Sequence, residues 1–76
     1  MEKEASYKDA AEQYKRAYML QNGSNPTIGY KLGFNYLKAK RYVDAIDICH
    51  SVLKQYPEYP KIRSEILDKA RISLKT

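Results

Sequence analysis

Residues 32 to 57 read LGFNYLKAKRYVDAIDICHSVLKQYP, and this stretch decides the fold. Leu32 and Tyr36 are four residues apart, so they share one face of a helix. A second apolar stripe follows at three- and four-residue steps, formed by Tyr42, Ala45, Ile46, Cys49, Val52 and Leu53. Two helices pack closely only where a small residue stands at the contact, and we expect Gly33 and Ala45 there. The stretch therefore predicts an antiparallel helical hairpin.

The hairpin has a short turn and a defined end. Lys38-Ala39-Lys40-Arg41 lies between the two apolar stripes and is expected to form the turn. Pro57 and Pro60 cannot continue a helix, so the second helix should end near Tyr56. Together the two helices make a unit of about 34 residues.

The spacing of this unit resembles that of the tetratricopeptide repeat (TPR) family. The matching positions are Leu32, Gly33, Tyr36, Ala45 and Pro57. The family usually has a Trp where this chain has Gly29, so Ile28 or Tyr30 is expected to fill that volume. The resemblance implies an all-α, non-enzymatic scaffold that binds other proteins.

Partial repeats flank the unit on both sides. Within residues 1–20, tyrosines and alanines follow the order of the second helix of the hairpin, which predicts the second helix of a preceding repeat. Residues 26–57 form the complete pair. In residues 60–76 a proline opens a helix with an apolar stripe from Ile62 to Leu74, which would cap the stack. The expected architecture is an α-solenoid fragment of about four TPR-like helices.

The composition agrees with a small helical domain. The chain has 43% apolar and 30% charged residues, and no period-2 strand pattern is present. No run of about 20 apolar residues could span a membrane, and the charged start does not resemble a signal peptide. A single cysteine excludes an internal disulfide, so a reducing compartment is expected.

The net charge of +5 is the strongest reason to consider other functions. Residues 60–76 hold five basic and two acidic side chains. The basic candidates for protein binding on this helix are Lys61, Arg63, Lys69 and Arg71. Three interpretations remain open for them: a solvated outer face, a contact with an acidic protein, and binding to nucleic acid or lipid.

A second set of binding candidates follows from the TPR resemblance, because the groove of that fold is lined mainly by the first helix of each pair. On that helix the candidates are Tyr30, Phe34, Leu37 and Lys38. Exposed aromatic residues in a groove are suitable anchors for a partner. The alternative is that these side chains pack against a preceding repeat.

Catalytic chemistry has little support in the sequence. His50 is the only histidine, and its neighbour Cys49 points to another side of the same helix, so the two cannot form a nucleophile and base pair. Asp44 and Asp47 share a helix face but lack further ligands at metal-binding spacing. We therefore expect no enzyme activity, no metal and no cofactor, and Cys49 is interpreted as a small buried hydrophobe.

A closer resemblance is carried by surface residues that repeat packing does not dictate, among them Lys38, Lys40, Arg41, Asp68 and Lys69. With the stretches 29–46, 59–63 and 66–71, these residues resemble the C-terminal end of the tetratricopeptide repeat protein 21 family. The resemblance implies a segment of the long TPR subunit of intraflagellar transport complex A, which serves retrograde transport and cargo entry in cilia.

The same resemblance implies that the partners are other subunits of that transport complex, and that the protein works in the cytoplasm, the cilium and the ciliary base. One alternative is a generic TPR adaptor for a linear peptide. A more distant alternative is a basic helical module that binds nucleic acid.

A repeat unit without its neighbour leaves an apolar face open, so we expect this chain to be marginally stable or to self-associate through its N-terminal helix. Sedimentation over a range of concentrations checks this expectation. A monomer at every concentration together with a high melting temperature would contradict it.

Overall fold

Helices account for most of the chain. The computed structural model describes residues 2–75, and the side chains of 6–59 and 61–75. The first three helices are α1 (Glu2–Leu20), α2 (Pro26–Lys38) and α3 (Tyr42–Gln55). A terminal helix then runs through α4 (Pro60–Ile62), the π turn η1 (Arg63–Leu67) and α5 (Asp68–Lys75). No strand occurs within residues 2–75, so the predicted all-α fold of about four helices is confirmed. Residues 1 and 76, which end the predicted ranges 1–20 and 60–76, lie outside the described residues.

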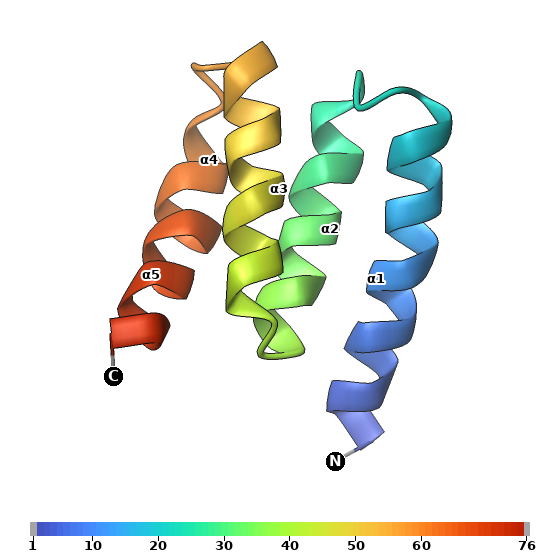
Figure 1. Cartoon of the computed structure of the whole chain (residues 1–76), viewed down its shortest axis with the longest axis vertical. Helices are drawn as coiled ribbons and strands as arrows, with labels where there is room; N and C mark the ends of the chain where they lie inside the picture. The colour runs from blue at the N-terminus through green and yellow to red at the C-terminus, as the bar shows by residue number, and fades with distance from the viewer. Residues whose placement is uncertain (1, 76) are drawn as a thin grey trace.

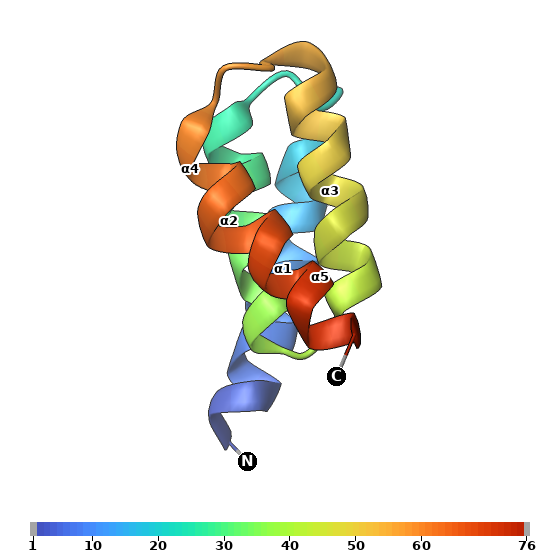
Figure 2. The same ribbon diagram turned by 90° about the vertical axis from the view of Figure 1, so that its left-hand side faces the viewer.

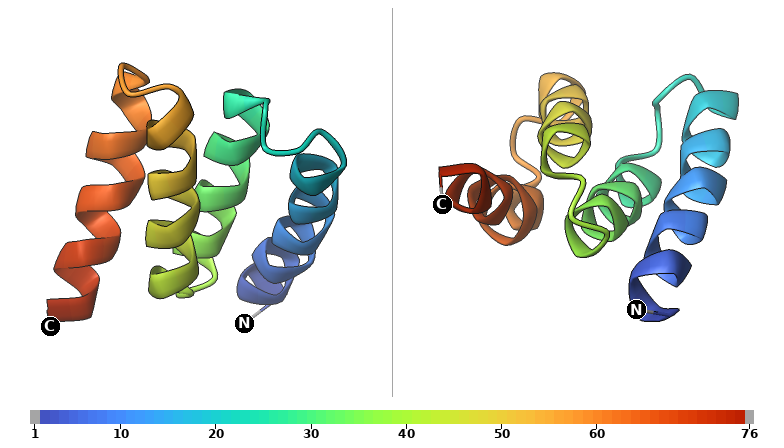
Figure 3. Two further views of the ribbon diagram at one scale, coloured as in Figure 1. Left: turned by 45° about the horizontal axis from the view of Figure 1, so that its top comes forward. Right: turned by 60° about the horizontal axis from the view of Figure 1, so that its bottom comes forward.

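The helices stand side by side in chain order (Figure 1). Helix α2 packs between α1 and α3, and α3 in turn contacts η1 and α5. Two turned views place α2 and the terminal helix in one layer and α3 in another (Figures 2 and 3). The molecule is a slab of 33 × 26 × 16 Å. This alternation of antiparallel helices between two layers is the arrangement of an α-solenoid.

The turn between α1 and α2 uses residues suited to its backbone. Asn22 and Gly23 have positive φ values of 55° and 70°, which asparagine and glycine adopt at low cost. The side chain of Asn25 then caps α2 by accepting a hydrogen bond from the backbone N–H of Thr27 at 3.0 Å. Pro26 follows as the first helical residue, where its missing N–H costs nothing.

The turn between α2 and α3 has similar geometry but a different sequence. The Arg41 N–H donates to the carbonyl of Tyr36 at 2.8 Å, and the Lys40 N–H donates to that of Leu37 at 3.1 Å. This pattern requires a left-handed backbone at Lys40, whose φ is 64°. The turn thus occupies Ala39–Arg41 of the four residues predicted for it, with Lys38 still in α2, and it places a lysine where glycine or asparagine is usual.

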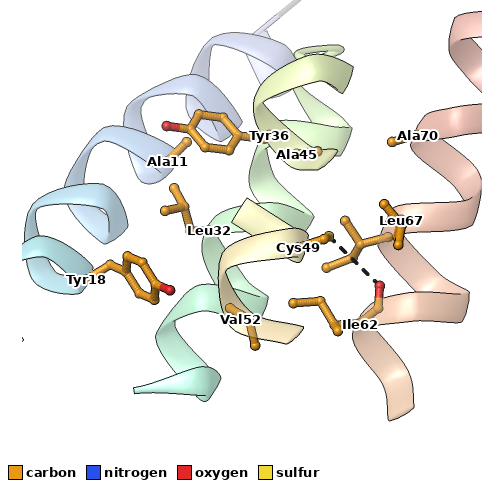
Figure 4. Packing of buried hydrophobic residues seen from close by; sticks show 11 residues of the cluster. Ala11, Tyr18, Leu32, Tyr36, Ala45, Cys49, Val52, Ile62, Leu67 and Ala70 are labelled. Carbon is orange, nitrogen blue, oxygen red and sulfur yellow. Dashed lines mark hydrogen bonds between the residues drawn. The ribbon is translucent and has the colours of Figure 1, made fainter. Parts of the chain in front are cut away.

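The core is one cluster that extends through all four helices (Figure 4). Its central members come from the hairpin, where Leu32, Ala45 and Cys49 are at most 1% exposed. The other buried hydrophobic residues are Ala11, Tyr18, Tyr36, Val52, Ile62, Ile66, Leu67 and Ala70. Pro57 is exposed just past the end of α3. The predicted stripe of the terminal helix ends earlier than expected, because Leu74 is 50% exposed.

Gly29 is the most crowded of the three glycines. A Cβ atom there would lie 2.3 Å from Cγ2 of Val52 and 3.0 Å from Cε1 of Tyr18. The Tyr18 ring of α1 therefore occupies space beside Gly29. The sequence predicted Ile28 or Tyr30 for this volume, and the structure shows that the preceding helix also contributes to it through Tyr18. Gly33 is less crowded, with its nearest neighbour, Cγ2 of Ile48, at 3.0 Å.

The π turn adjusts the phase of the terminal helix. Positions eight residues apart on a regular α-helix are offset by about 80°. In η1 the Asp68 N–H donates to the carbonyl of Arg63, five residues back, which widens the turn and reduces that offset. Ile62 and Ala70 are as a result both fully buried.

We expect Gly29→Ala to lower the free energy of unfolding by about 1–2 kcal/mol, because the added methyl overlaps the stiff, buried Val52. Gly33→Ala should stay within about 1 kcal/mol of the original chain, because better helix propensity offsets a small shift of Ile48. Gly33→Leu should cost about 1–3 kcal/mol by overpacking. Urea unfolding followed by circular dichroism measures all three, and a Gly29→Ala chain as stable as the original would contradict this packing.

Candidate binding surfaces

Tyr30 is the candidate of α2 that lies nearest the start of the terminal helix. Its hydroxyl donates a hydrogen bond to the carboxylate of Glu65 in η1. Its ring lies 6.1 Å from that of Tyr59, measured between centroids, at an angle of 46°. The bond to Glu65 is the main cause that raises the pKa of Tyr30 to about 12, and burial adds to it. Tyr30 therefore holds α2 to the terminal helix.

Phe34 and Lys38 lie further along α2 and face solvent. The Phe34 side chain is 37% exposed, and the Lys38 ammonium sits over its ring, 5.3 Å from the centroid. A cation in this position is attracted by the face of the ring. The contact restricts the long lysine side chain while leaving its charge accessible.

The C-terminal end of α2 borders a hollow of about 400 Å³, which we call the lysine hollow. The α2–α3 turn and α5, which both contribute to its lining, lie side by side with α3 in the fold, and the turn and the C-terminal end of α5 are at the same end of the molecule (Figure 1). Its lining includes Leu37, Lys38, Lys40, Tyr42, Lys69 and Ile72. The structure thus brings Leu37 and Lys38 of the predicted groove together with Lys69 of the predicted basic helix.

The remaining basic candidates do not share this surface. Lys69 and Arg71 are two residues apart on α5, so they point to nearly opposite sides of the helix. Arg63 and Arg71 line a second hollow of about 560 Å³, the arginine hollow. Its lining also includes His50, Leu53, Lys54 and Asp68. Lys61 is exposed and lines neither hollow, so the basic residues of the terminal helix form two surfaces rather than one.

Sequence reasoning missed part of the lysine hollow. Tyr42 was assigned only to the hairpin stripe, and Ile72 was not singled out, although it lies off the buried stripe and is 62% exposed. An exposed isoleucine beside a cluster of lysines was the available signal. Its relation to Leu37 depends on the packing of α5 against α3, which periodicity alone does not report.

Cys49 is fully buried, as predicted for a small core residue. Its thiol lies 4.0 Å from the carbonyl of Ile62, to which it donates (Figure 4). Burial raises the pKa of the thiol to about 12, so the reactive thiolate is suppressed. His50 beside it is exposed. In the described part of the chain, no three His, Cys, Asp or Glu side chains are grouped to hold a metal ion.

The helices of residues 2–75 also fall short of the length and hydrophobicity that crossing a bilayer requires. Among the hollows of the described surface, the lysine hollow and the arginine hollow bring the predicted binding residues together with aliphatic side chains. Such surfaces suit the binding of another macromolecule.

Comparison with known proteins connects this fold to a family. Residues 1–71 match the family described as the tetratricopeptide repeat protein 21 C-terminal ARM domain. The chain is 65% identical over 75 residues to tetratricopeptide repeat protein 21B of Mus musculus and of Homo sapiens. It is 61% identical over 75 residues to tetratricopeptide repeat protein 21A of Mus musculus. Each match covers 99% of this chain and 6% of the relative, so the chain spans a small part of their length.

We expect Cys49 to resist a thiol reagent such as Ellman's reagent in the native chain and to react fully after unfolding. Because its pKa is raised above 9.0 in the folded chain, the unfolded chain loses this proton first. The contribution of Cys49 to stability is therefore complete below about pH 9 and falls as the pH rises toward 12. Urea unfolding at increasing pH checks this, with Cys49→Ala as control, whose stability should fall less. Rapid labelling of the native chain at neutral pH would contradict the burial.

Proposed function

Because this chain belongs to the tetratricopeptide repeat protein 21 family, we propose that it is a non-enzymatic protein-binding segment of an intraflagellar transport complex A subunit. Repeats of this class are helical interaction scaffolds, and this chain has their layered antiparallel architecture. In the proposed role it contacts other subunits of the complex, in the cytoplasm, at the ciliary base and in the cilium. The complex acts in retrograde transport and in the assembly of the cilium.

The observation that carries the proposal is 65% identity across 99% of the chain. Identity at this level extends to the surface, because the buried core is a minority of the residues. Identical residues therefore extend beyond the packing positions, which favours an interaction surface over a purely structural cap. The +5 charge further favours an acidic partner.

A generic adaptor that binds a linear peptide is the second candidate. The lysine hollow favours it, because an apolar depression edged by cations can hold a single peptide side chain. The two candidates differ in their partners: a fixed subunit of one complex in the first, and interchangeable peptides in the second.

The test is affinity purification of the parent-length protein with and without residues 26–76, followed by mass spectrometry. We expect deletion to reduce recovery of the other transport-complex subunits, because the segment provides a contact to them. Unchanged recovery would overturn the proposed role within the complex and favour the adaptor.

A second variant avoids the loss of whole helices. Reversal of Lys61, Arg63 and Arg71 to Glu changes exposed side chains only, so helix content should be unchanged by circular dichroism. If the arginine hollow contacts an acidic subunit, recovery should fall to the level of the deletion. Full recovery of every subunit would exclude these three residues from the interface.

A further inference from the structure

The lysine hollow combines an apolar lining with three cations from separate parts of the fold. Lys38 ends α2, Lys40 stands in the α2–α3 turn, and Lys69 lies on α5. The apolar part is contributed by Leu37 and Ile72. We propose that this hollow binds an acidic peptide segment of a protein partner, with one apolar side chain between Leu37 and Ile72 and flanking carboxylates on the three lysines. The inference rests on the proposed protein-binding function and assigns it to a site.

The ammonium groups of the hollow lack carboxylate partners within the described chain. The ion pair at this end of the molecule joins Arg41 to Asp44 at 3.8 Å, which leaves Arg41 engaged locally. Among residues 6–75, no carboxylate forms an ion pair with any of the three lysines, and none lines the hollow. A set of like charges held together without compensation is complementary to an acidic ligand.

Lys40 supplies an independent observation. Its φ of 64° lies in the left-handed region, which costs most residues other than glycine about 1–2 kcal/mol. The corresponding position of the α1–α2 turn holds Asn22, at a φ of 55°, which tolerates this backbone. The same turn geometry therefore occurs twice in the fold. Asn22 suits the left-handed backbone in one turn, and Lys40 occupies it in the other. A lysine that is unfavourable for its backbone and lines a hollow points to a role for its charge.

The form of the site favours a peptide over the other anionic ligands. A bilayer is flat and takes up protruding side chains, whereas here the apolar residues line a depression. Nucleic acid requires a track of cations that follows successive phosphates. These lysines instead edge an open depression of about 400 Å³, which offers room for one large side chain. The contact of Lys38 with Phe34 also holds one cation in place before binding.

The test uses this chain and a short fluorescein-labelled peptide in which Asp and Glu flank a central Leu, with fluorescence polarisation as the readout. A peptide with Ala in place of the Leu should bind about fivefold more weakly, since it loses the apolar contact. The variant Lys38→Gln/Lys40→Asn/Lys69→Gln should weaken binding of the Leu peptide about tenfold, at roughly two- to threefold per exposed ion pair.

The matched control is Lys8→Gln/Lys15→Gln/Lys75→Gln, which removes the same charge from exposed positions that do not line the hollow. It should bind the Leu peptide within about twofold of the original chain. Equal losses in both triple variants would overturn the site, because only net charge would then matter. Equal binding of the Leu and Ala peptides would overturn the apolar contact and with it the proposal. Tighter binding to a single-stranded oligonucleotide or to phosphatidylserine vesicles than to the peptide would also overturn it.

The variant Lys40→Asn separates binding from folding. It should raise the melting temperature by about 2–5 °C, because asparagine relieves the left-handed backbone, while weakening the peptide complex two- to threefold. A lower melting temperature would overturn the premise that Lys40 is retained for its charge.

The two proposals fail in different ways. If deletion of 26–76 releases transport subunits from the parent-length protein but the lysine triple variant retains them and the original chain binds no peptide, the hollow is excluded while the proposed function holds. If the peptide binds as expected but deletion releases no subunit, the hollow is supported and the role within the complex is excluded.

Discussion

The position of α2 depends on the missing side chain at Gly29. Because no Cβ atom stands there, the Tyr18 ring and Val52 both approach the α2 backbone, one from each neighbouring helix. The Tyr18 hydroxyl also forms a hydrogen bond with Ser51 of α3 at 3.0 Å, across the two helices that enclose α2. A single close approach thus sets the spacing of three helices. A further hydrogen bond, donated by the Tyr56 hydroxyl to the carbonyl of Ser24 at 2.7 Å, connects the end of α3 to the α1–α2 turn.

This spacing determines which surfaces the molecule presents. With α2 held close to α3, the terminal helix packs beside both, and the π turn keeps Ile62 and Ala70 facing the core. The same rotation of the terminal helix places Lys69 at the lysine hollow, beside the end of α2, and Arg71 at the arginine hollow on the other side of the slab. The two hollows therefore result from the way the terminal helix packs against α2 and α3.

The two hollows differ in the chemistry they offer. The lysine hollow has three ammonium groups and no carboxylate among its described lining residues, which suits dispersed carboxylates around an apolar anchor. The arginine hollow contains Asp68 among its cations, so its field is partly compensated. Membership of the tetratricopeptide repeat protein 21 family places both on a scaffold whose class binds proteins. Tyr30 differs from the residues that line the hollows, because its hydrogen bond to Glu65 engages its side chain within the fold.

Much of the fold was determined by the sequence alone. The spacing of Leu32, Tyr36 and Ala45, with prolines at the ends, was sufficient for the hairpin, because helical periodicity and helix breakers act locally. The surface pattern was also sufficient for the family. Only the tertiary structure decided that Tyr18 lies beside Gly29, that Tyr30 is engaged, and that Lys38, Lys40 and Lys69 meet at one hollow. These groupings depend on distances between helices and on the phase shift at the π turn, which the order of residues along one helix does not encode.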